Sequence, residues 1–161
     1  DLGGEEEGGR VVRGIGEVVG RVSKVVGVVG VVAFSMGAKV ATEVVRRLEG
    51  DGEREVKVVV AVCATAPYQG GGMMKEGAGE EERRAWEGRW REVLGREKVK
   101  AKSVHVIGGS DPWRGQSERL VELFGEEGRR VVRFDGGHHM PVEEKVNREI
   151  AKAVMEACGM V

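Results

Sequence analysis

The sequence of 161 residues lacks the composition of several specialised classes of protein. It has two cysteines, Cys63 and Cys158, which lie far apart and form no Cys-x-x-Cys pair or disulfide-dense pattern, so we expect reduced core thiols in an intracellular protein. Its positive and negative side chains nearly balance, with 26 Lys and Arg and 27 Asp and Glu. We therefore expect no nucleic-acid partner, since there is no basic field to attract one.

The sequence also lacks a run of apolar residues long enough to cross a membrane, a basic-then-apolar start typical of a signal peptide, and an Asn-x-Ser/Thr site. We expect a soluble, cytoplasmic protein without a membrane partner. The length predicts one domain over residues 1–161. The chain begins without Met on an acidic, glycine-rich stretch, DLGGEEEGGR, which predicts a fragment or a displaced start.

The sequence does contain a regular alternation of helical and strand patterns. Continuous β-branched runs predict buried strands, and apolar residues at helical spacing predict helices between them. The predicted strands cover residues 28–34, 56–62, 103–107 and 130–134. The predicted helices cover residues 11–22, 38–48, 116–128 and a last segment with Pro141 in its first turn. This order predicts an α/β fold, a parallel sheet flanked by helices in three layers.

The alternation stops at about residues 67–100. A glycine-rich loop there leads into a charged helical segment with Trp86, Trp90 and Leu94 at intervals of four residues. These side chains are either the packed side of one helix or the lining of an acyl pocket. We expect a lid-like insertion over one end of the sheet.

Three residues of types common in active sites come after predicted strands. Ser35 follows the first predicted strand, Asp111 the third strand and His138 the fourth strand. Active residues of open parallel sheets lie beyond the carboxyl ends of the strands. The chain order Ser, Asp, His is that of the α/β-hydrolases, in which a histidine deprotonates the serine and an acid orients the histidine. Taken alone, a serine such as Ser35 is more often a helix N-cap than a nucleophile, and Asp111 before Pro112 is ordinarily a turn residue. Together, in this order and after these strands, they favour the catalytic interpretation.

The neighbours of Ser35 fit a nucleophile elbow, a sharp turn from strand to helix. Ala33 and Gly37 are small, as we expect where a strand and a helix approach closely. The backbone amide of Met36, at the positive end of the next helix, is expected to donate to an oxyanion.

Three stretches resemble a eukaryotic, largely fungal family of serine hydrolases (FSH), a branch of the α/β-hydrolases. VVAFSMGAKVA is similar to the family's G-F-S-Q-G-A elbow, HVIGGSDPW to its D-P acid loop and FDGGHHMP to its G-G-H-x-x-P histidine loop. The resemblance covers about residues 11–158. It departs at Ala33 and Met36, where the family has Gly and Gln. The family's N-terminal part, with an L-H-G-type loop that supplies a second oxyanion donor, has no counterpart before Val11, so we expect an N-terminally truncated domain.

The resemblance implies roles for three residues: Ser35 as nucleophile, Asp111 as acid and His138 as base, with no cofactor. The implied reaction is hydrolysis of a carboxylic ester or thioester of a small acyl substrate, as in fungal esterases and thioesterases of secondary metabolism. Two alternatives stay open. One is acyl transfer on the same fold. The other is a weak or inactive hydrolase-like domain that binds a partner or forms a homodimer through an open sheet edge.

The remaining histidines have ordinary explanations. His138 and His139 are adjacent in the chain, and no third ligand stands at a familiar spacing, so we expect no metal site. By the resemblance, His139 points away from the serine. His105 lies inside a predicted strand, and we expect a half-buried structural residue.

Overall fold

The structure, a computed structural model, describes residues 30–50, 52, 56–65 and 79–160, with part of the side chains in residues 80–94. The predicted helix over residues 11–22 and the glycine-rich loop of the predicted insertion lie outside the described residues. The side chains of Trp86, Trp90 and Leu94 lie outside them too. The single domain and its lid-like insertion stay predictions.

Parallel strands form the centre of the described molecule. They are β1 (Gly30–Phe34), β2 (Val58–Val62), β3 (Lys102–Gly108) and β4 (Arg129–Phe134). All three pairings are parallel, and the strands lie side by side in the order of the chain. One row across the sheet joins Ala33, Ala61, His105 and Val131. Because the strands are parallel, the carboxyl ends of these four strands lie at one edge of the sheet.

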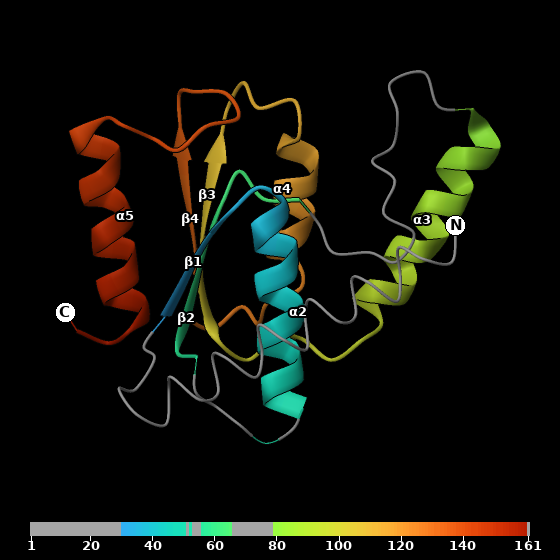
Figure 1. Cartoon of the computed structure of the whole chain (residues 1–161), viewed down its shortest axis with the longest axis horizontal. Helices are drawn as coiled ribbons and strands as arrows, with labels where there is room; N and C mark the ends of the chain where they lie inside the picture. The colour runs from blue at the N-terminus through green and yellow to red at the C-terminus, as the bar shows by residue number, and fades with distance from the viewer. Residues whose placement is uncertain (1–29, 51, 53–55, 66–78, 161) are drawn as a thin grey trace.

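Helices connect and cover the strands. They are α2 (Met36–Gly50), α3 (Glu80–Leu94), α4 (Arg114–Val121) and α5 (Glu144–Ala157). In Figure 1, α2 and α4 lie on one face of the sheet and α5 on the other, while α3 lies beyond α4, away from the strands. The predicted three-layer α/β fold is confirmed. No helix within the described ranges is long and apolar enough to cross a membrane.

Each face of the sheet has its own apolar core. On one face, the stripe predicted for α2 packs with Val59, Ala61 and the end of α4. On the other face, α5 packs against Val60, Val104 and other strand residues. β2 is buried at every position because strands flank it and helices cover it, which explains its unbroken apolar sequence.

Two predicted helix boundaries are wrong. The helix predicted over residues 116–128 ends at Val121, because the chain after it turns aside to pair Phe124 with Val99 in a parallel bridge and to bury its ring. The last helix begins at Glu144 rather than at Pro141. Glu143 before it is extended, with ψ of 126°, so the helical turn cannot reach back to the proline.

Candidate active site

Ser35 forms the turn between β1 and α2 in a left-handed backbone conformation, with φ of 52°. A non-glycine residue in this region costs about 1 to 3 kcal/mol, and an ordinary N-cap serine is extended instead. Backbone hydrogen bonds hold the turn: the Ser35 amide donates to the Val62 carbonyl at 3.0 Å, and the Ser35 carbonyl accepts from the Thr65 amide at 3.3 Å. The backbone therefore has the strained geometry of an elbow rather than that of a simple cap.

The side chains of Ser35, His138 and Asp111 form one continuous chain of hydrogen bonds. His138 Nε2 lies 2.9 Å from Ser35 Oγ, and His138 Nδ1 lies 3.1 and 3.0 Å from the two carboxylate oxygens of Asp111. The Asp111 carboxylate has no exposed surface and also accepts from the Trp113 amide at 2.8 Å. Since a carboxylate only accepts, Nδ1 carries the proton, which leaves Nε2 free to accept the proton of the serine hydroxyl.

Backbone contacts between two glycine-rich loops bring Asp111 and His138 together. The amide of Gly109 donates to the Phe134 carbonyl, and that of Ser110 to the Gly136 carbonyl, each at 2.9 Å. At Gly108, a Cβ atom would lie 2.5 Å from the Gly137 carbonyl oxygen. Gly108 is therefore required for the close approach of the loops. Sequence reasoning missed this role, because its partner lies in another loop.

The surroundings of Ser35 agree only in part with the predicted elbow. Met36 is the first residue of α2, so its amide has no acceptor within the helix and is available to an oxyanion. At Gly37, however, a Cβ atom would meet nothing within 4 Å among the described residues. Within the described residues, nothing requires Gly37 to be small, so the predicted reason for this glycine stays a prediction.

The structure separates the three histidines. His139 is exposed, its Nδ1 lies 3.0 Å from the Met140 carbonyl, and its ring packs on Phe134. His105 is 1% exposed rather than half-buried, because α4 and the turn after it cover that face of β3. Burial, and to a lesser extent the charge of Arg129, lowers the pKa of His105 to about 3, so the ring is neutral.

Cys63 lies beside the hydrogen-bonded chain, where sequence reasoning assigned only a core thiol. It is fully buried and left-handed, with φ of 44°, and its Sγ lies 3.6 and 3.5 Å from the carbonyl oxygens of Gly137 and His139. Burial is the main cause that raises the pKa of this thiol. Its position directly after β2, at the same edge of the sheet as Ser35, could have indicated that Cys63 lies near the site.

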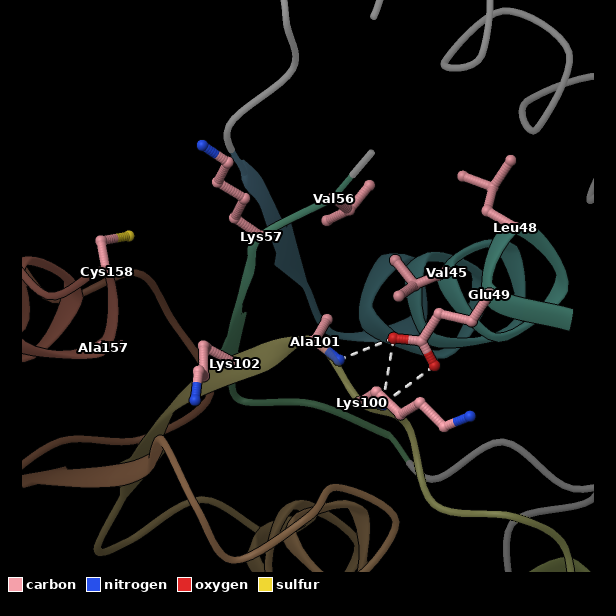
Figure 2. Close-up of a pocket in the computed structure, with 10 residues that line it drawn as sticks. All are labelled: Val45, Leu48, Glu49, Val56, Lys57, Lys100, Ala101, Lys102, Ala157 and Cys158. Atoms are coloured by element: carbon pink, nitrogen blue, oxygen red, sulfur yellow. Dashed lines mark hydrogen bonds between the residues drawn. The ribbon is translucent and has the colours of Figure 1, made fainter. Parts of the chain in front are cut away.

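A pocket of about 300 Å³ lies near the amino-terminal ends of the strands, opposite the edge of the sheet that holds Ser35. Figure 2 shows Glu49 in this pocket, where its carboxylate accepts hydrogen bonds from the backbone amides of Lys100 and Ala101. The amino groups of Lys57, Lys100 and Lys102 point in different directions. They do not converge on one anion, and the pocket contains none of the residues around Ser35.

A family model described as "Serine hydrolase (FSH1)" matches residues 5–150. The thioesterase FSL2 of Gibberella zeae is 30% identical over 132 residues, which cover 80% of this chain and 50% of that protein. The esterase FUS5 of Gibberella fujikuroi is 42% identical over 53 residues, which cover 32% of this chain and 23% of that protein. The chain thus spans half or less of the length of these curated relatives.

Solved structures share the fold at low sequence identity. An esterase of Pyrobaculum calidifontis superposes with a TM-score of 0.65 at 15% identity, covering 92% of this chain and 60% of its own. The type II thioesterase BorB from the borrelidin biosynthetic cluster superposes with a TM-score of 0.58 at 20% identity, covering 93% of this chain and 70% of its own.

Proposed function

Because this chain belongs to the serine hydrolase (FSH1) family, we propose that it hydrolyses a carboxylic ester or thioester through Ser35, His138 and Asp111. The observation that carries the proposal is the 2.9 Å contact between Ser35 Oγ and His138 Nε2, on an imidazole whose other nitrogen faces a buried carboxylate. A nucleophile, a base and an orienting group within hydrogen-bond reach are the geometric requirements of covalent acyl transfer.

The reaction has two halves. Ser35 Oγ attacks the acyl carbon while His138 Nε2 takes the hydroxyl proton, and the Asp111 carboxylate stabilises the imidazolium. The Met36 amide donates to the developing oxyanion. His138 then protonates the departing alcohol or thiol, which leaves an acyl-serine. In the second half His138 deprotonates a water molecule, which releases the acid and restores the serine.

The surface around Ser35 favours an apolar acyl group. The Phe34 ring lies 5.0 Å from the imidazole of His138 and is partly exposed, and the side chains of Met36 and Met140 are exposed nearby in the chain. Such a surface stabilises a short hydrocarbon chain by burying it. The two fungal relatives are an esterase and a thioesterase. We therefore propose that the leaving group released by this chain is an alcohol or a thiol.

The test is intact-mass spectrometry after incubation with a fluorophosphonate, which phosphonylates an activated serine. We expect one adduct per chain, and no adduct for Ser35→Ala or His138→Ala. Ser110→Ala and His139→Gln are the matched controls, because both residues are exposed and neither contacts Ser35 Oγ. Both controls should label like the unchanged chain.

Two outcomes contradict the proposal. If the folded chain does not label, the alternative of a non-catalytic binding module gains support. If labelling persists in Ser35→Ala, another residue is the nucleophile. Where labelling behaves as expected, the products formed from acyl esters in water, with and without an added alcohol, distinguish hydrolysis from acyl transfer.

A further inference from the structure

Three groups that bind metal ions meet beside Ser35. One ligand atom each from Cys63, Asp111 and His138 lies within 4.8 Å of the other two. The nitrogen of His138 that faces the carboxylate is Nδ1, at 3.0 Å from Asp111 Oδ2. The three residues come from the carboxyl ends of three different strands, so nothing in their sequence spacing indicates a common site.

The donor set suits a soft divalent cation. A thiolate, a carboxylate and a neutral imidazole carry two negative charges, which balance one divalent ion in a site where two of the three side chains are buried. Sulfur and nitrogen donors favour Zn²⁺ over Mg²⁺ or Ca²⁺. Ligand atoms around tetrahedral Zn²⁺ stand about 3.3 to 3.6 Å apart, so side-chain shifts of about 1 Å are enough to close the cluster.

We propose that Cys63, Asp111 and His138 form an inhibitory binding site for Zn²⁺ or a similarly soft divalent cation. Three protein ligands leave a fourth position for water. His138 is the accessible member of the cluster, with a quarter of its side chain exposed, and the ion enters from its side. The inhibition rests on the proposed function, whereas the binding does not.

Binding of the ion removes the base from the reaction. In the free protein Nδ1–H donates to Asp111, and the lone pair of Nε2 accepts the Ser35 hydroxyl. When Nδ1 binds the ion through its lone pair, the ring proton stands on Nε2, which can no longer accept a proton from Ser35. The Cys63 thiol binds as thiolate and releases one proton to solvent, so each ion bound releases one proton.

The first experiment measures binding without reference to activity. The chain, freed of metal by a chelator, is titrated with Cd²⁺ while the thiolate-to-cadmium ultraviolet absorption is recorded, and Zn²⁺ is then added as a competitor. We expect one Cd²⁺ per chain and displacement by Zn²⁺. Cys63→Ser should lose the absorption, while Cys158→Ser should keep it. Cys158 is the matched control because it lies at the far end of the sheet, in the pocket of Figure 2.

A second variant covers the case in which Cys63→Ser does not fold. His138→Gln keeps the thiolate and removes the imidazole, so its affinity for Cd²⁺ should fall by at least about tenfold. An unchanged affinity in His138→Gln overturns the site. So does absorption that persists in folded Cys63→Ser or disappears in Cys158→Ser, because the ion then binds elsewhere.

Labelling by the fluorophosphonate separates the two proposals. With Zn²⁺ present, labelling of Ser35 should slow in the unchanged chain and in Cys158→Ser, and zinc should leave the rate of Cys63→Ser at its own metal-free value. Equal slowing of Cys63→Ser by Zn²⁺ overturns the inhibitory site. If the metal-free chain does not label at all, the proposed hydrolysis fails, while the Cd²⁺ titration still decides whether the cluster binds an ion.

Discussion

The serine and the acid–histidine pair are built on different parts of the sheet. Ser35 follows β1, an outer strand of the described sheet, where Val32 is 67% exposed. Asp111 follows β3, which strands flank on both sides and whose Val104 is fully buried. His138 follows β4, the other outer strand of the described sheet, but its loop is joined to the acid loop by backbone hydrogen bonds.

The two regions therefore hold their side chains in position in different ways. The acid is held by burial, and the base is held beside it by the backbone hydrogen bonds between the two loops, so these loop contacts fix their relative position. The serine is held by its strained turn and by hydrogen bonds to the residues that end β2. We therefore expect small changes on the acid–histidine side to cost more than comparable changes on the serine side.

The largest expected effect comes from Asp111→Asn. The amide can still accept from the Trp113 backbone, but it no longer stabilises the imidazolium and favours the wrong tautomer of His138. We expect the rate of fluorophosphonate labelling to fall by about 10⁴-fold with the fold retained. Asp135→Asn, a change at an exposed carboxylate in the histidine loop, should label normally. Equal labelling of both variants would show that Asp111 is only structural.

Much of the fold was predictable because its strands are indicated by runs of neighbouring residues in the sequence. The β-branched run of β2 and the stripe of α2 correspond to buried segments, and the positions of Ser35, Asp111 and His138 follow from the rule on strand ends. The prediction of a buried strand over residues 28–34 is wrong for β1, where Val32 is 67% exposed, because β1 is an outer strand of the described sheet. The end of α4 was not predictable, since Val99 comes from a distant segment to pair with Phe124. The closeness of Cys63 to Asp111 was missed for the same reason, because it depends on which strands are neighbours.

The two regions differ in their tolerance of one methyl group. Gly108→Ala places a Cβ atom 2.5 and 2.7 Å from two carbonyl oxygens of the histidine loop, whereas Gly37→Ala, after Ser35, meets no described residue within 4 Å. We expect Gly108→Ala to lower the free energy of unfolding by about 1 to 3 kcal/mol. It should also slow labelling by about 100-fold through displacement of the pair. Urea unfolding and labelling rates check both variants, and a larger loss for Gly37→Ala would reverse the comparison.

His105, which is buried on β3, should also make the stability of the protein depend on pH. The pKa of His105 is about 3 in the folded protein, while an unfolded histidine titrates near its ordinary pKa of roughly 6.5. Below that ordinary value the unfolded chain takes up a proton that the folded chain does not, so stability is full above it and falls as the pH drops towards 3. At pH 5 we expect a loss of about 2 kcal/mol relative to neutral pH.

His105→Gln isolates this contribution to the pH dependence. Glutamine can still hydrogen-bond to Ser103, which lies 3.0 Å from His105 Nε2, but it does not titrate. Its urea unfolding free energy should change less between pH 7 and pH 5 than that of the unchanged chain. The exposed His139→Gln serves as control and should retain most of the pH dependence. An equal slope in His105→Gln and the unchanged chain would contradict the assignment.

The smallest effect should come from the outer strand itself, and a matched pair of substitutions measures it. Val32 and Val104 lie in one row of the sheet, both in register with Val60 and on the same face. Val104→Thr buries a hydroxyl in an apolar core, which should cost about 1 to 3 kcal/mol in urea unfolding. Val32→Thr leaves its hydroxyl in water and should change stability by less than about 0.5 kcal/mol. Equal costs would mean that the α5 face of β1 is as well covered in solution as the centre of the sheet, and the division between the two regions would then fail.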